Sequence, residues 1–298
     1  YYLVIMKRVL FWVLFLFSCY FIMFFNVKRF ETFSTFPAIW SDLQQFIPEN
    51  DSQWRYEEIN IKDTDGNNIN GLYIPYWDWH GKTIYYFHGN GGPLSYFYSD
   101  INYIHSLGYN IMAYDYPGYG KSEWFPYKEK VDEFSKIFYK HVKKEKNIQD
   151  EKLIIWWYSI GTAVAASFAT ENNFERIILV GTLASRHEMS RKIFWFALQK
   201  LFFLKDSYDT KTLVKQFKKP ALMIHGNNDS IVPLQQWKQV FENYAWKKYF
   251  IEIENFWHNG MLRIYGDTLR DYILTFLDWK SLNFPWNYLL INETKTKK

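Results

Sequence analysis

Short apolar runs recur along most of the chain and predict the strands of a buried sheet. Runs that are apolar throughout are typical of strands that are covered on both faces. In a strand with one solvent-exposed face, apolar and polar residues alternate. The runs lie at residues 83–87, 110–114, 153–158, 176–180, 221–226 and 248–253. Two further strands are expected near 57–62 and 70–75, separated by the turn at 63–67.

Helices are expected between these strands. They are predicted near residues 95–107 and 128–145, and from Ser159 to about Thr170. Strands that alternate with helices form a largely parallel sheet with helices on both faces. The pattern therefore predicts an α/β domain, and about 250 residues beyond the N-terminal segment suit one such domain better than two.

Three residues suited to nucleophilic catalysis each lie just past the end of a predicted strand. They are Ser159, Asp229 and His258. In an open α/β sheet, this edge is where ligands bind. A serine between an apolar strand and a small-residue helix is typical of a nucleophile elbow, with an acid and then a histidine expected later in the chain.

Polar residues at the strand ends can also be interpreted as structural and not catalytic. Asp229 could cap the helix expected to start near Pro233, and an isolated histidine such as His258 is more often structural. His88 and His225 end strands and are expected to hydrogen-bond within loops. Asp115, likewise past a strand end, is expected to be a structural turn residue. The joint occurrence of serine, acid, histidine and an upstream glycine-rich loop favours the catalytic interpretation.

That loop is His88-Gly89-Asn90-Gly91-Gly92, directly after the strand at 83–87. Its glycines would let backbone N–H groups approach a ligand closely. Four segments now resemble one known family, the α/β-hydrolase superfamily; they are residues 86–92, 114–122, 158–163 and 225–233. Within the superfamily, the likeness is to the membrane-anchored "alpha/beta-hydrolase domain-containing" serine hydrolases, a group related to the serine aminopeptidases.

The resemblance covers residues from about 55 to 280 and implies an α/β-hydrolase fold with a short helical cap at about 183–217. It implies Ser159 as nucleophile, His258 as base and Asp229 as the acid that orients the base. Backbone N–H groups of Ile160 and Asn90 would form the oxyanion hole. The supporting residues would be His88, Gly89, Gly91 and Gly161.

The reaction implied is hydrolysis of an ester or thioester, with a small-molecule or lipid acyl substrate and with no metal or organic cofactor. A serine aminopeptidase-like peptidase remains an alternative, because both reactions use the same three residues. Apolar positions between 193 and 204 would give the cap a surface for an acyl group or a membrane. A packed surface helix is the alternative interpretation of that segment.

Tryptophan stands at several positions where the family has glycine. Trp157 replaces the first glycine of the G-x-S-x-G motif, Trp257 precedes His258, and Trp124 follows Lys121-Ser122-Glu123. The chain has 14 Trp and only 14 Gly among 298 residues, about 5% glycine against an average of about 7%. We hypothesise that these tryptophans are glycines in the cell, as when UGA is read as glycine. If they are genuine, Trp157 and Trp257 are expected to crowd the catalytic residues, and a catalytically impaired pseudo-hydrolase becomes the alternative.

The N-terminal segment predicts a membrane anchor. Lys7 and Arg8 precede an apolar run over residues 9–25, and Lys28 and Arg29 follow it. The run is just long enough for a bilayer core of about 30 Å. No small-residue cleavage site follows, which favours an uncleaved anchor over a signal peptide. Basic residues on both sides determine the orientation only weakly, and the short tail favours an extracytoplasmic catalytic domain.

The sequence thus divides into a membrane anchor at 1–30, with Met6 as the expected start, and a juxtamembrane linker at 31–54. A hydrolase domain at 55–280 and a C-terminal tail at 281–298 follow. The net charge of +4 is scattered, which gives nucleic-acid binding no support. One cysteine excludes an intrachain disulfide, and no Cys/His cluster has metal-ligand spacing.

Overall fold

The computed structural model describes residues 2–37, 55–77, 81–193, 208–278 and 287–292. The chain divides into two compact units, Tyr1–Pro37 and Ala38–Lys298. In the first unit, one helix, α1 (Tyr2–Thr35), runs five residues past the expected anchor boundary at 30. Its stretch Ile5–Ile22 is long and apolar enough to cross a membrane, a property that a signal sequence near an N-terminus shares.

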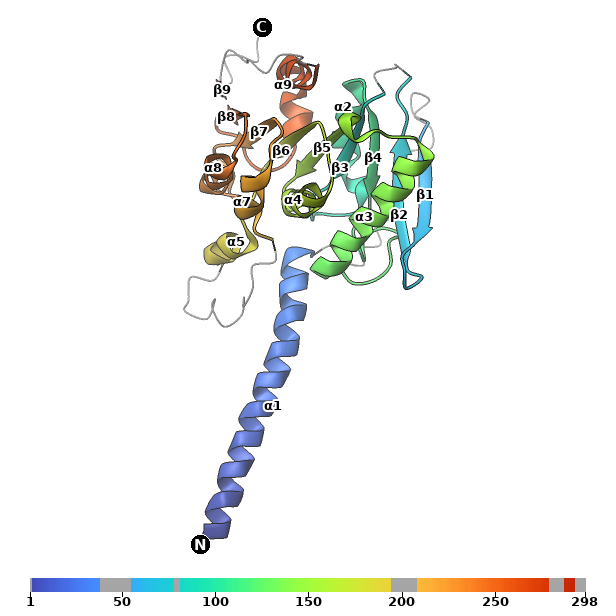
Figure 1. Cartoon of the computed structure of the whole chain (residues 1–298). Coiled ribbons are helices and arrows are strands. Elements are labelled where there is room, and N and C mark those ends of the chain that lie inside the picture. Colours follow the sequence, from blue (N-terminus) through green and yellow to red (C-terminus); the bar gives the residue numbers. More distant parts are fainter. Residues whose placement is uncertain (1, 38–54, 78–80, 194–207, 279–286, 293–298) are drawn as a thin grey trace. The chain divides into compact units, whose positions relative to one another are not determined.

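The second unit is built on a nine-stranded sheet with the order β1-β2-β4-β3-β5-β6-β7-β8-β9 (Figure 1). Strand β2 pairs antiparallel with both β1 and β4, and all the other neighbours are parallel. The strands are β1 (Glu57–Lys62), β2 (Asn68–Ile74), β3 (Thr83–Phe87), β4 (Asn110–Tyr114), β5 (Leu153–Tyr158), β6 (Arg176–Val180), β7 (Ala221–Gly226), β8 (Lys248–Ile253) and β9 (Tyr288–Ile291).

Helices cover both faces of this sheet (Figure 1). One face packs against α2 (Tyr98–Ser106) and α9 (Met261–Asp278). The other carries α3 (Lys128–Glu145), α4 (Gly161–Glu171) and α8 (Leu234–Asn243). The remaining short elements are α5 (Arg186–Ile193), α7 (Thr210–Leu213), and the 3-10 helices η1 (Leu94–Phe97), η2 (Asp150–Lys152) and η3 (Val214–Gln216).

The apolar runs are buried as predicted, because helices cover both of their faces. Every residue of β3, β5, β6 and β7 is buried. Successive side chains point to opposite faces. Trp156 and Tyr158 of β5 therefore join the core under α2 and α9, while Trp157 between them faces the other layer. The predicted α/β class, with a largely parallel sheet, is confirmed.

Strand β9 lies outside the domain boundary expected at 280. Its four residues pair in parallel with β8, for example Ile253 with Ile291, so the segment 281–298 is not only a tail. The run is short and only its last residue is buried, which leaves little pattern to detect. The apolar positions expected to form the cap at 194–204 lie outside the described residues, as does most of the expected linker at 31–54.

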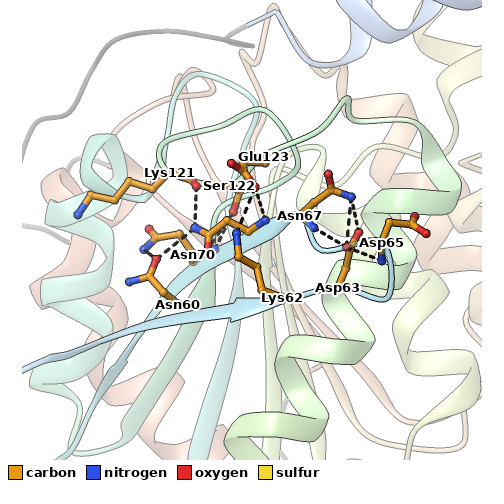
Figure 2. A network of polar contacts seen from close by, with 10 residues as sticks. Asn60, Lys62, Asp63, Asp65, Asn67, Asn70, Lys121, Ser122 and Glu123 are labelled. Carbon is orange, nitrogen blue, oxygen red and sulfur yellow. Dashed lines mark hydrogen bonds and ion pairs between the residues drawn. The ribbon is translucent and has the colours of Figure 1, made fainter.

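A polar network fixes the turn between β1 and β2 (Figure 2). Asp63 accepts backbone N–H groups from Asp65 and Asn67 at 2.9 and 2.7 Å, and Lys130 of α3 donates to its other oxygen at 2.9 Å. Nearby, the side chain of Glu123 accepts the backbone N–H of Asn68 at 2.6 Å. The network therefore ties the antiparallel edge of the sheet to α3 and to the loop that follows β4.

Candidate active site

Ser159 occupies a sharp turn between β5 and α4. Its φ of +53° is in the left-handed region, which is uncommon and costly for a residue other than glycine. Its N–H donates to Val180 O at 3.0 Å, so the neighbouring strand holds the turn. A β-carbon at Gly161 would lie 2.2 Å from Phe87 O, so only glycine lets α4 start so close to β3. These are the features of a nucleophile elbow.

The structure brings the three predicted residues together in one line of hydrogen bonds. Ser159 Oγ lies 2.9 Å from His258 Nε2, and His258 Nδ1 lies 2.6 Å from Asp229 Oδ2. All three residues are buried. They follow the carboxyl ends of β5, β7 and β8. These strands and β6 are adjacent and parallel in the order β5-β6-β7-β8, so their carboxyl ends lie at the same edge of the sheet.

Asp229 is held as an ionised acceptor. Its Oδ1 accepts the N–H groups of Ile231 and Val232 at 2.9 and 2.8 Å. Burial alone raises the pKa of Asp229, but the hydrogen bond to His258 and the nearby imidazoles outweigh burial and lower the pKa below its usual value. The residue does not cap α8, which begins at Leu234, so the capping interpretation is wrong.

His225 and His88 bond within their loops, which confirms that expectation. His225 Nε2 lies 2.9 Å from Val232 O, and burial lowers the pKa of His225 to about 4. His88 Nδ1 lies 2.7 Å from Gly89 O, and burial lowers the pKa of His88 to about 3. Both rings are therefore neutral at pH 7 and can donate one N–H each.

The glycine-rich loop is tied down through its carbonyl groups. Tyr116 Oη donates to His88 O at 2.7 Å, and Tyr119 Oη donates to Asn90 O at 3.1 Å. Asp115 fixes the far end of the loop, because it accepts the N–H of Leu94 at 2.7 Å. Asp115 is therefore structural, as expected, and burial raises its pKa to about 7.

Two residues at the site were not predicted. Gly181 follows β6 with a φ of +61°, and a β-carbon there would lie 3.0 Å from His258 Cε1. Tyr158 precedes the serine, and its hydroxyl donates to His258 O at 2.9 Å. Both residues lie at the ends of predicted strands, and Tyr158 is also in the segment 158–163 that resembles the family. Neither residue type by itself indicates contact with a histidine.

The expected crowding of the site by Trp257 is wrong. The indole of Trp257 is 56% exposed and stacks on Phe256. Trp157 is fully buried in the opposite layer of the sheet from Tyr158, and its Nε1 has no partner among the described residues. Crowding by Trp157 stays a prediction. Trp124 is different, because it is exposed and has a φ of +77°, a backbone state that favours glycine.

Within the described residues, no group of three or more His, Cys, Asp or Glu side chains is placed to hold a metal ion. The site has a hydroxyl, an imidazole and a carboxylate joined by hydrogen bonds, from Ser159 through His258 to Asp229, beside the first turn of α4. The N–H groups of a first helical turn have no acceptors within the helix and favour negative charge. Such a site can activate the hydroxyl and stabilise an anion next to it.

Comparisons with known proteins agree with this fold. A family model described as serine aminopeptidase, S33 matches residues 80–204. The uncharacterized protein YfhR of Escherichia coli O157:H7 is 24% identical over 75% of this chain and 81% of its own length. The alpha/beta hydrolase domain-containing protein WAV2 of Arabidopsis thaliana is 25% identical over 64% of this chain and 67% of its own length.

Solved structures share the architecture at lower identity. An esterase of Pyrococcus furiosus superposes with a TM-score of 0.65 at 17% identity, covering 78% of this chain and 93% of the esterase. The family model, the relatives and the shared fold together support a member of the α/β-hydrolase superfamily. An alpha-beta hydrolase of Vibrio vulnificus is similar to this chain with a TM-score of 0.64 at 17% identity, covering 83% of this chain and 92% of the hydrolase. The predicted fold class is thereby confirmed, and the superfamily supports a hydrolase.

Proposed function

We propose that this α/β-hydrolase is a serine hydrolase that cleaves an ester or thioester by transferring the acyl group to water. The observation that carries the proposal is the hydrogen-bonded line from Ser159 through His258 to Asp229. An esterase of Pyrococcus furiosus and an acetyl xylan esterase of Paenibacillus are among the proteins with similar folds, which supports an ester over other acyl bonds.

In this proposal, Ser159 Oγ attacks the carbonyl carbon of the substrate while His258 Nε2 takes the hydroxyl proton. The tetrahedral intermediate then collapses, and His258 passes the proton to the leaving group. Asp229 keeps the Nδ1–H tautomer and stabilises the imidazolium as it forms. A water molecule repeats the sequence with the acyl-enzyme, which releases the acid and restores the serine.

The oxyanion would be held by the backbone N–H groups of Ile160 and Asn90. Ile160 directly precedes α4, so its N–H stands at the positive end of that helix. The carbonyl of Gly89 accepts from His88, and in a trans peptide the N–H points opposite to the carbonyl. The N–H of Asn90, in the same peptide unit, therefore points away from His88. Loss of one such donor typically costs about 3 kcal/mol of transition-state stabilisation.

We further propose that α1 anchors the enzyme to a membrane. Ile5–Ile22 has the length and apolar composition of a span. Lys7 and Arg8, near its start and directly before the apolar run at 9–25, are typical of a membrane boundary. A cleaved signal sequence is the alternative. Alkaline carbonate extraction of membranes distinguishes them, because an anchored chain stays in the pellet and a processed chain is released.

A peptidase is the second candidate, because the matching family model is described as a serine aminopeptidase. The test is a panel of p-nitrophenyl esters of increasing chain length against aminoacyl-p-nitroanilides, with Ser159→Ala as the control. We expect ester turnover that Ser159→Ala abolishes. Turnover of the anilides alone would favour the peptidase, and turnover of neither by a folded, full-length chain would favour a pseudo-hydrolase.

A further inference from the structure

Tyr158 touches the three parts of the site at once. It directly precedes Ser159 at the end of β5, and its side chain is almost fully buried. Its hydroxyl reaches His258 O at 2.9 Å and Asn259 Oδ1 at 3.0 Å. Its ring centroid lies 5.4 Å from that of His258. One side chain thus spans from the serine to the loop that carries the base.

The same ring also supports the glycine-rich loop. A β-carbon on Gly89 would lie 3.0 Å from Tyr158 Cδ1, so the backbone of Gly89 rests against the edge of the ring. Phe97, from the element that follows this loop, packs on Tyr158 with ring centroids 6.0 Å apart. The tyrosine therefore lies between the proposed oxyanion loop and the histidine loop.

We propose that Tyr158 is a positioning residue for His258, and this inference rests on the proposed function. The hydroxyl donates a hydrogen bond to the carbonyl of His258. The ring packs between the imidazole and the backbone of Gly89. This contact fixes the backbone from which the imidazole reaches Ser159 Oγ. A displacement of about 1 Å between reacting groups can lower a rate on the order of a hundredfold.

The burial of Tyr158 keeps its hydroxyl in the donating form. Burial raises the pKa of Tyr158 well above its usual value, so the hydroxyl stays neutral across the working range of a hydrolase. Its single proton is shared between the two oxygen atoms of the histidine loop. Deleting the hydroxyl would leave His258 O, in a buried residue, without this donor, and the loop would be free to shift.

The test is Tyr158→Phe in the full-length chain, with Tyr244→Phe as the matched control. Tyr244 is also buried and also donates to a backbone carbonyl, Lys219 O at 2.8 Å, at a strand start rather than at the site. Both variants lose one buried hydrogen bond, so we expect similar falls in melting temperature. Only Tyr158→Phe should lower kcat, by about tenfold or more, with KM little changed.

A double-mutant cycle shows whether the effect passes through His258. In a His258→Ala background, Tyr158→Phe should cause no further loss of the residual turnover. An equal loss in both backgrounds, or a kcat for Tyr158→Phe that matches Tyr244→Phe, would overturn the inference.

A spectroscopic readout separates this inference from the proposed function. The downfield proton resonance of His258 Nδ1–H, bonded to Asp229, does not require turnover. We expect it to shift or broaden in Tyr158→Phe and to stay unchanged in Tyr244→Phe. If the wild-type chain turned over no substrate while the resonance moved, the function would fail and the positioning role would stand. An unmoved resonance in an active enzyme would reject the positioning role alone.

Discussion

The imidazole of His258 rests on the bare backbone of Gly181. A β-carbon there would lie 3.0 Å from His258 Cε1, which is tighter than ordinary contact, and 3.4 Å from Nδ1. Gly181→Ala should therefore push the ring away from Ser159 and lower kcat/KM on the order of a hundredfold. Steady-state ester hydrolysis measures this effect.

Gly66→Ala is the matched control for that prediction. Gly66 also has a positive φ, +88°, but a β-carbon there would meet nothing within 4 Å. Both substitutions impose backbone strain of about 1–2 kcal/mol, so both should lower the melting temperature. If Gly66→Ala lost as much activity as Gly181→Ala, the loss would reflect strain and not contact with His258.

Trp124→Gly should stabilise the protein. The φ of +77° at Trp124 is strained for tryptophan, and the indole is 53% exposed, so removing it sacrifices little packing. Relief of the strain is expected to contribute about 1 kcal/mol, which raises the melting temperature in a thermal scan.

The control is Trp246→Gly. Trp246 is also exposed, at 45%, but its φ is not positive, so glycine there should lower the melting temperature slightly. In the gene, we expect UGA at codon 124. A UGG codon, together with no gain in stability from Trp124→Gly, would refute the hypothesis that this residue is a glycine in the cell.

Asp63→Asn should weaken the fold in a pH-dependent way. Burial alone raises the pKa of Asp63, but hydrogen bonds from Asn67 and Lys130 outweigh burial and lower the pKa to about 2. Because the pKa is lower in the folded state, the carboxylate stabilises the fold above about pH 4, and this stabilisation is lost as the pH falls towards 2.

Urea unfolding at several pH values measures this prediction. We expect Asp63→Asn to lower the free energy of unfolding by about 2 kcal/mol at pH 7, and the deficit to shrink towards pH 3. Asp65→Asn, which removes the more exposed partner of Lys130, should cost less than about 1 kcal/mol. A deficit for Asp63→Asn that stays constant down to pH 3 would contradict the argument.

The sheet could be predicted from sequence because helices bury most strands on both faces. Strand β5 is an unbroken apolar run, and its end locates Ser159. Strand β9 could not be predicted, because its stability comes from pairing with β8 and only Ile291 is buried. Pairing with β8 leaves no clear hydrophobic pattern in the sequence of β9.

The site could be predicted as a set of residues but not as a set of contacts. Chain order and strand ends indicated Ser159, Asp229 and His258. The contact of His258 with Gly181 arises only because β6 lies between β5 and β7 in the sheet. The error about Trp257 has a similar origin, since its indole is exposed and stacks on Phe256, and a linear motif does not show the direction of a side chain.

Mass spectrometry of a covalent adduct shows whether Ser159 is the nucleophile. The full-length chain is treated with a fluorophosphonate, digested and mapped by peptide mass. We expect one phosphonyl adduct on Ser159, absent from Ser159→Ala and formed much more slowly in His258→Ala, with folding unchanged in both. An adduct on another residue, or equal labelling of Ser159→Ala, would contradict this expectation.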